Sequence, residues 1–386
     1  MLYTYTELDA AERHALDRID ALRRDLRHSV VQNPQRWTGL LARMTRAKAL
    51  RASNSIENIN VSQEDAIAAI DGEDPAEADR PTWQAITGYQ SAMTYILQRC
   101  RDHGFTFSVD SILAIHFMIS QSDLNANPGN FRRGWVGVRN LLTNEIVHEG
   151  ADRELLKSLI DELVEYLNNE AAAPHVIIKA AMAHLNLTLM HPFSDGNGRT
   201  ARCLQTAVLA NEGIAAREFS SIEEYIGRNQ QEYYDVLAAA GGGGWNPDRN
   251  AKPWIRFCLK GHYVQIQTLL RRNQELGAVY GDLQKLVRER GLLERMALGL
   301  LDAAFGIRMR NASYRVSTDI SNNLASRDLK QLVDRGLLLP KGERRGRHYI
   351  ASDEVRAIRE MHRLKRPITD PFEEVEANPN QLALAV

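Results

Sequence analysis

The chain has 386 residues, of which 44% are hydrophobic and 25% are charged. This composition is typical of a globular protein that is long enough for two or three domains. The formal net charge of -1 argues against affinity of the whole chain for nucleic acid or for an anionic membrane. Cys100, Cys203 and Cys258 lie far apart and have no histidine at metal-ligand spacing, so we interpret them as buried thiols of a cytoplasmic protein. The start of the chain lacks a signal segment.

Apolar periodicity indicates a mainly helical chain. Helices are predicted at residues 7–27, 37–50, 81–101, 155–167, 176–190, 200–212 and 253–276. Residues 176–190 are apolar on nearly every face, which predicts a central, enclosed helix rather than a membrane span. Turn residues followed by short apolar runs predict a small β-hairpin within residues 125–150.

One loop, residues 191–202, carries the chemistry and reads His-Pro-Phe-Ser-Asp-Gly-Asn-Gly-Arg-Thr-Ala-Arg. Gly196 and Gly198 allow the backbone to approach a ligand closely, and their N–H groups at a helix start can hold phosphate oxygens. Arg199 and Arg202 are three residues apart, so both can reach one anion.

Two further groups in the loop suit catalysis. Beside bound phosphates, Asp195 is a natural ligand for Mg²⁺, which takes one or two carboxylates plus phosphate oxygens. His191 is the group that titrates near neutral pH, and it suits a general base for an incoming hydroxyl. His116, His175 and His184 show no metal-binding spacing, and we interpret them as core or surface histidines.

The loop matches the Fic signature HxFx(D/E)GNGRxxR, and the resemblance to that family extends from about residue 35 to residue 275. It implies an all-α Fic core with a β-hairpin flap, and a protein adenylyltransferase that moves AMP from ATP to a Ser, Thr or Tyr hydroxyl and releases pyrophosphate. By this resemblance His191 is the base and Asp195 holds Mg²⁺. Asn197 and the loop amides bind the α- and β-phosphates, and the two arginines bind the β- and γ-phosphates.

Three other segments resemble parts of Fic proteins. The residues that resemble the target-docking flap are Val136, Gly137, Val138 and Arg139. Tyr233 and Tyr234 lie where related proteins contact adenine. Residues 53–58 fit the inhibitory pattern (S/T)xxxE(G/N), with Ser53 and Glu57 on one helix face. The resemblance implies that Glu57 pairs with Arg202 and keeps ATP in an unproductive position.

The C-terminal part resembles a winged helix-turn-helix, because a helix ending in glycine precedes a basic hairpin. The hairpin cations that could contact phosphates are Lys341, Arg344, Arg345 and Arg347. Such a domain serves equally as a protein-binding module, so DNA contact stays open, as do self-modification and a homodimer.

The predicted organisation has four parts. They are an N-terminal helical region (1–104) with the inhibitory helix near 53–58, the Fic core (105–276), the winged-helix-like domain (277–366) and a disordered tail (367–386). The main hypothesis is an autoinhibited protein adenylyltransferase. The alternatives are a nucleotide-sensing DNA-binding regulator, and a hydrolase that removes AMP on the same fold.

Overall fold

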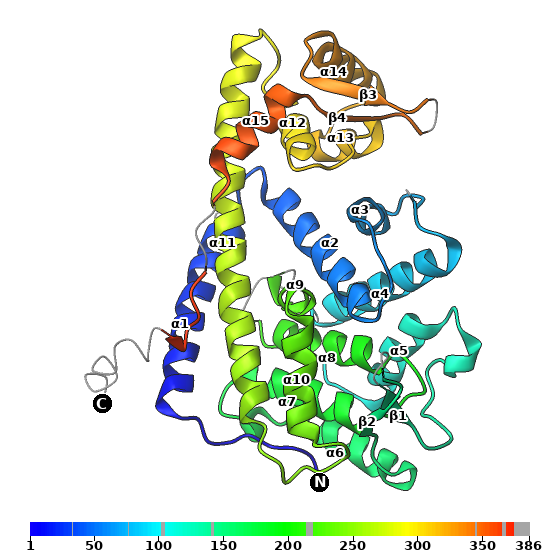
Figure 1. Ribbon diagram of the computed structural model, residues 1–386. Coiled ribbons are helices and arrows are strands. Elements are labelled where there is room, and N and C mark those ends of the chain that lie inside the picture. Colours follow the sequence, from blue (N-terminus) through cyan, green and yellow to red (C-terminus); the bar gives the residue numbers. More distant parts are fainter. Residues whose placement is uncertain are drawn as a thin grey trace.

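The computed structural model describes residues 1–32, 34–75, 77–101, 105–139, 143–213, 219–343, 346–364 and 368–373. These residues form mainly helices and two separate two-stranded antiparallel sheets, so the all-α fold class is confirmed (Figure 1). Within these ranges, none of the helices is both long and apolar enough to span a lipid bilayer.

The first half of the chain supplies the N-terminal helices and the flap. Its elements are α1 (Ala10–Arg27), η1 (His28–Gln32), α2 (Thr38–Ile56), α3 (Gln63–Asp71), α4 (Arg80–Arg99), α5 (Val109–Ser120), η2 (Leu124–Ala126), β1 (Gly137–Arg139), β2 (Ile146–Glu149), η3 (Arg153–Leu155), α6 (Leu156–Asn168) and η4 (Glu170–Ala172). The second half supplies α7 (Val176–Met190), α8 (Asn197–Asn211), α9 (Glu223–Arg228), α10 (Gln230–Gly241), α11 (Lys252–Glu289), α12 (Met296–Ala304), α13 (Asn311–Thr318), α14 (Asn322–Asp334), β3 (Leu338–Lys341), β4 (His348–Ala351) and α15 (Asp353–His362).

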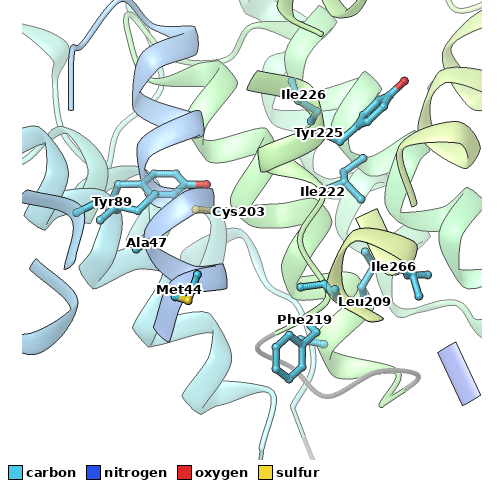
Figure 2. Packing of buried hydrophobic residues seen from close by; sticks show 14 of the residues in the cluster. Met44, Ala47, Tyr89, Cys203, Leu209, Phe219, Ile222, Tyr225, Ile226 and Ile266 are labelled. Carbon is cyan, nitrogen blue, oxygen red and sulfur yellow. The ribbon is translucent and has the colours of Figure 1, made fainter. Parts of the chain in front are cut away.

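Helix α7 is the centre of the fold, as its uniform apolarity predicted. Every residue from Ile177 to Leu187 is buried. It packs against α6, α8, α10 and α11. Its side chains belong to one continuous core that also includes residues of α2, α4 and α9, and Figure 2 shows part of this core. Asn186 is one of the few polar residues in α7, and it exchanges two hydrogen bonds with the backbone of Tyr3, at 2.8 and 3.0 Å. The start of the chain is therefore fixed to the central helix.

Helix α11 is longer than the sequence predicted. The expected end near Leu276 and the domain boundary at 277 are not seen, because the helix runs on without interruption to Glu289 (Figure 1). Gly277 allows this helix to lie close to Trp37, since an added Cβ would come within 2.9 Å of the indole ring. The C-terminal helices α12 and α15 then pack on the second half of α11. The first and second halves of α11 thus contact different parts of the chain.

The tail prediction was wrong for residues 368–373. Phe372 lies under the Arg256 guanidinium, 5.2 Å from it, and Asp370 pairs with Lys260 at 3.1 Å, so this segment packs on α11. The remaining tail, residues 374–386, and Pro367 lie outside the described residues.

Arg43 links the helix that bears Glu57 to the C-terminal part. Its guanidinium, on α2, bonds Asp71 at 2.6 Å and Asp302 of α12 at 3.2 Å. Burial raises the pKa of Asp302 to about 6, and the neighbouring Arg43 opposes this shift. Arg43 therefore compensates the charge of two carboxylates at the point where α2, α3 and α12 meet.

We predict that Arg43→Ala lowers the free energy of unfolding by about 3 kcal/mol, because removing one partner of a buried ion pair leaves uncompensated charge. Urea unfolding monitored by circular dichroism measures this change. Arg51→Ala is the matched control, since Arg51 lies on the same helix and is exposed. Equal losses in the two variants would show that the Arg43 contacts do not stabilise the fold.

Candidate active site

The site is built on the sharp turn between α7 and α8. His191 ends α7 in the left-handed conformation, with φ of 52°, and Gly196 precedes α8 with φ of 77°. Helix α8 begins at Asn197, three residues earlier than predicted, and its first backbone bond joins Thr200 N–H to the Gly196 carbonyl at 2.9 Å. The N–H groups of the first turn before Thr200 are thus not used by the helix, which makes this end suitable for an anion.

The Asn197 side chain closes the loop on itself. It accepts a bond from Phe193 N–H and donates one to the Phe193 carbonyl, both at 2.9 Å, and the residue is only 2% exposed. The expected phosphate contact of Asn197 is therefore limited to its backbone N–H, because the side chain is already engaged. Its role is to hold the shape of the turn.

His116 of α5 supports the loop from below, although the sequence analysis gave it no role. Gly129 N–H donates to its Nδ1, and its Nε2 lies 3.0 Å from the Asp195 carbonyl, which fixes Nε2 as the donor. Its ring stacks on Phe193 with centroids 3.8 Å apart. Burial lowers the pKa of His116 to about 4, so the ring is neutral at pH 7 and keeps the acceptor that this arrangement needs.

His191 is held in one orientation. Its Nδ1 lies 3.1 Å from the Thr188 carbonyl, so Nδ1 carries the proton and Nε2 keeps a lone pair. Burial is the main reason why the pKa of His191 is lowered to about 4. The buried Arg132, which no sequence signal identified, donates through Nε to the His191 carbonyl at 2.8 Å and through its backbone N–H to the Pro192 carbonyl at 3.0 Å. The neutral His191 ring, with Nε2 as a proton acceptor, is thereby fixed at the start of the loop.

Two buried arginines of α8 face the start of their own helix. Arg199 donates to Asp195 at 3.1 Å, and the Asp195 side chain is 62% exposed. Arg199 Nε and Arg202 Nη1 are buried and have no hydrogen-bond partner within the described ranges. An unpaired buried N–H of a cation is costly, so these atoms suit an incoming anion.

Arg202 joins α8 to the end of α2. It donates to the Ser53 hydroxyl at 2.8 Å, to the Ser53 carbonyl at 3.0 Å and to Glu57 Oε1 at 2.7 Å. Arg202 is 1% exposed, whereas the Glu57 side chain is 31% exposed. Burial alone would lower the pKa of Arg202, but the charge of Glu57 raises it. The two residues that the inhibitory pattern singled out therefore both contact this arginine.

The Glu57 carboxylate lies directly on the first turn of α8. A Cβ added at Gly198 would come within 2.6 Å of Glu57 Oε1, so only glycine leaves room for the carboxylate here. Negative charge is stabilised at a helix N-terminus. Glu57 thus occupies the position that a bound anion would take.

The two tyrosines of α10 have different surroundings. Tyr233 is 2% exposed and its hydroxyl lies 3.1 Å from His184 Nε2, so it belongs to the core. The expected contact with adenine does not fit this position. Tyr234 is 42% exposed, and its hydroxyl donates to the Ile56 carbonyl at 2.8 Å. Tyr234 therefore holds the end of α2, next to Glu57.

The flap lies beside this loop. β1 pairs with β2 in an antiparallel register that includes Val138 opposite His148. The Glu149 N–H, at the end of β2, donates to the Gly243 carbonyl at 2.9 Å, so the outer edge of β2 is partly covered. Within the described ranges, the outer edge of β1 pairs with no further strand. Trp135 lies over Gly137, where any side chain would collide with the indole, and it is 61% exposed. Of the predicted flap residues, Val136, Gly137 and Val138 are half-buried and Arg139 is exposed.

Comparisons with known proteins agree with this geometry. Residues 106–209 match the model of the Fic/DOC family. It is 30% identical over 173 residues to protein adenylyltransferase Fic of Aedes aegypti, which covers 45% of this chain and 31% of that protein. It is 31% identical over 161 residues to protein adenylyltransferase fic-1 of Caenorhabditis briggsae, covering 42% and 28%. The chain thus spans under a third of the length of these relatives.

A solved structure resembles nearly the whole chain. A Fic family protein from Desulfovibrio desulfuricans G20 superposes with a TM-score of 0.59 at 20% identity, over 92% of this chain and 99% of that one. At this identity the likeness shows the shared fold.

We predict that His116→Ala loosens the loop before it affects the rest of the fold. Two hydrogen bonds and a stacked ring are lost, so the amides of residues 193–197 should exchange about tenfold faster. Hydrogen exchange followed by mass spectrometry measures this. His175→Ala is the control, because His175 pairs with Asp20 in another part of the protein. Unchanged exchange in the loop of the His116 variant would contradict the supporting role.

Proposed function

We propose that this protein is an autoinhibited protein adenylyltransferase, which transfers AMP from ATP to a hydroxyl of a protein. The observation that carries the proposal is the arrangement around the α7–α8 turn. Free first-turn amides and two buried arginines with unpaired N–H groups lie at one end of the loop, and the neutral His191 lies at the other. The family match and the names of the relatives support this function.

The proposed reaction needs one proton acceptor and a well-positioned anion site. The oxygen of a target Ser, Thr or Tyr attacks the α-phosphorus of ATP, and His191 Nε2 takes the hydroxyl proton. The bond from the α-phosphorus to the bridging oxygen breaks, and pyrophosphate leaves with the electron pair. Gly196, Gly198 and the arginines align the phosphates and neutralise their charge, so positioning supplies most of the acceleration.

Asp195 is the residue that would hold Mg²⁺. Its exposed carboxylate fits an ion that takes one or two carboxylates and otherwise uses phosphate oxygens and water. No cluster of three or more metal-ligating side chains occurs in the described part of the chain, so the phosphates have to supply further ligands. When bound, Mg²⁺ neutralises charge on the transferring phosphates.

Inhibition follows from the position of Glu57. Its carboxylate is bonded to Arg202 and lies on the first turn of α8, so the γ-phosphate and Glu57 compete for one arginine. ATP that cannot reach Arg202 then presents its α-phosphate out of line for attack. Ser53 binds the same guanidinium, and Tyr234 fixes the neighbouring backbone, which together hold Glu57 in the inhibiting position.

The flap suits a docking role. The unpaired edge of β1, with Val136, Gly137, Val138 and Arg139, can add a strand of the target beside the loop. The exposed Trp135 provides a large apolar surface next to this edge. The target sequence would therefore be held mainly through its backbone.

One observation favours hydrolysis as a second candidate. Glu57 is close enough for its charge to oppose the lowering of the pKa of His191, so a carboxylate and a neutral imidazole share the site. Such a pair can orient a water molecule for attack on an AMP–protein bond. A cytoplasmic location is also part of the proposal, supported by three buried free thiols.

We predict that Glu57→Gly raises self-labelling by α-labelled ATP roughly tenfold or more, equivalent to at least about 1.4 kcal/mol of the barrier. Adding His191→Ala should abolish this labelling, and γ-labelled ATP should give none because the γ-phosphate leaves with pyrophosphate. Autoradiography of gels measures all of these. Glu212→Gly is the control, since Glu212 also caps a helix C-terminus and pairs with a cation, Lys179.

Equal labelling of wild type and Glu57→Gly would show that Glu57 does not inhibit AMP transfer. Full labelling with His191→Ala would exclude His191 as the base. Release of free AMP from an AMP-modified protein by wild type, lost in Glu57→Gly, would instead favour the hydrolase.

A further inference from the structure

The C-terminal part carries a separate surface that the adenylyl-transfer site does not use. Helices α12, α13 and α14 are followed by the β3–β4 hairpin, and a bridge between Met309 and Tyr349 joins the segment after α12 to that hairpin. α13 and α14 are joined by a tight turn at Asp319, with φ of 51°, and Ser321 caps α14. This is the element order of a winged helix-turn-helix, in which the second helix of the turn enters the DNA major groove.

The charge of this part differs from that of the whole chain. Residues 291–366 contain 16 Lys and Arg against 9 Asp and Glu, whereas the full chain has 48 against 49. The near-zero net charge of the full chain is therefore the sum of a basic C-terminal unit and an acidic remainder of the chain. This is the charge distribution expected when one domain binds a polyanion.

The cations of this unit divide into two groups by position. Those that face the rest of the protein or the interior are neutralised: Arg295 pairs with Asp328 at 2.7 Å, Arg308 with Glu77 at 3.1 Å, Arg310 with Glu73 at 2.8 Å and Arg359 with Glu275 at 3.3 Å. Those on the helix-turn-helix and the hairpin have no ion-pair partner in the described ranges of the chain. These are Arg315, Arg327, Lys330, Lys341 and Arg347.

The unneutralised cations are all exposed, and α14 also carries a group that can read bases. On α14, Asn323, Arg327 and Lys330 are exposed at helical spacing, whereas Ala325, Leu329 and Leu332 pack inward. Asn makes paired hydrogen bonds with adenine, and Arg and Lys bond guanine in the major groove. α14 lies on the side of the unit turned away from α2 and α3, so a duplex can approach this helix (Figure 1).

We propose that this surface binds double-stranded DNA. α14 enters the major groove with Asn323, Arg327 and Lys330 toward base edges. Arg315 of α13, together with Lys341 and Arg347 of the hairpin, contacts the phosphates on either side. The predicted hairpin cations Arg344 and Arg345 lie outside the described residues. An acidic protein partner would need the positive charge but not Asn323, and it would not need a helix free on its whole outer face.

The test uses the full-length protein and fluorescence anisotropy with 30-base-pair duplexes, first a random pool and then a sequence selected from it. Wild type should bind the pool at low salt and weaken steeply as salt rises. Arg327→Ala should weaken binding to the selected sequence roughly tenfold and bring it close to the affinity for the pool. Arg315→Ala should weaken both duplexes equally and reduce the salt slope by about 1.

Arg356→Ala is the matched control, because Arg356 is an exposed cation of the same unit on α15, paired with Asp353. It should leave both affinities unchanged, and circular dichroism of every variant shows that the fold is retained. Two results would overturn the proposal. One is absence of duplex binding by folded wild type at low salt. The other is competition by poly-glutamate as effective as that by DNA, which would indicate a surface for acidic proteins.

Discussion

Under the proposed function, the ion pair between Arg202 and Glu57 is the contact on which the activity of this protein depends. It joins residues 145 positions apart in the sequence and connects the end of α2 to α8. Arg202 is buried, so its charge has to be compensated by a neighbour or by a ligand. Glu57 is partly exposed and can leave, which makes this pair an exchangeable contact rather than a permanent part of the core.

The surrounding structure makes that exchange specific. The α7–α8 turn is held by Asn197 from within, by His116 from α5 and by Arg132 from the segment before the flap, and none of these contacts involves Glu57. The end of α2 is held by its own contacts, including the Tyr234 hydroxyl bond to the Ile56 carbonyl, while the Glu57 side chain is 31% exposed. An anion site that is held from three sides, next to a partly exposed carboxylate, is the arrangement that competition between Glu57 and phosphate requires.

The sequence predicted the parts of this arrangement that depend on local pattern. The loop motif and the enclosed helix follow from residue type and spacing, whereas the pairing of Glu57 with Arg202 was expected from the resemblance to Fic proteins. The supporting contacts could not be predicted, because His116 and Arg132 come from distant segments and carry no motif. Tyr233 and Tyr234 are adjacent on a helix, so their sequence could not tell which ring faces the core. The same holds for α11, whose continuation past Gly277 depends on packing against Trp37.

The central claim is that the charge of Glu57 keeps the γ-phosphate from Arg202, and calorimetric titration with ATP and ADP tests it most directly. Wild type should bind the two nucleotides equally, because the γ-phosphate finds no partner. Glu57→Gln keeps the shape but removes the charge, and it should bind ATP about fivefold more tightly than ADP, as expected for an ion pair worth about 1 kcal/mol. The same ratio of ATP to ADP affinity in both proteins would contradict the account.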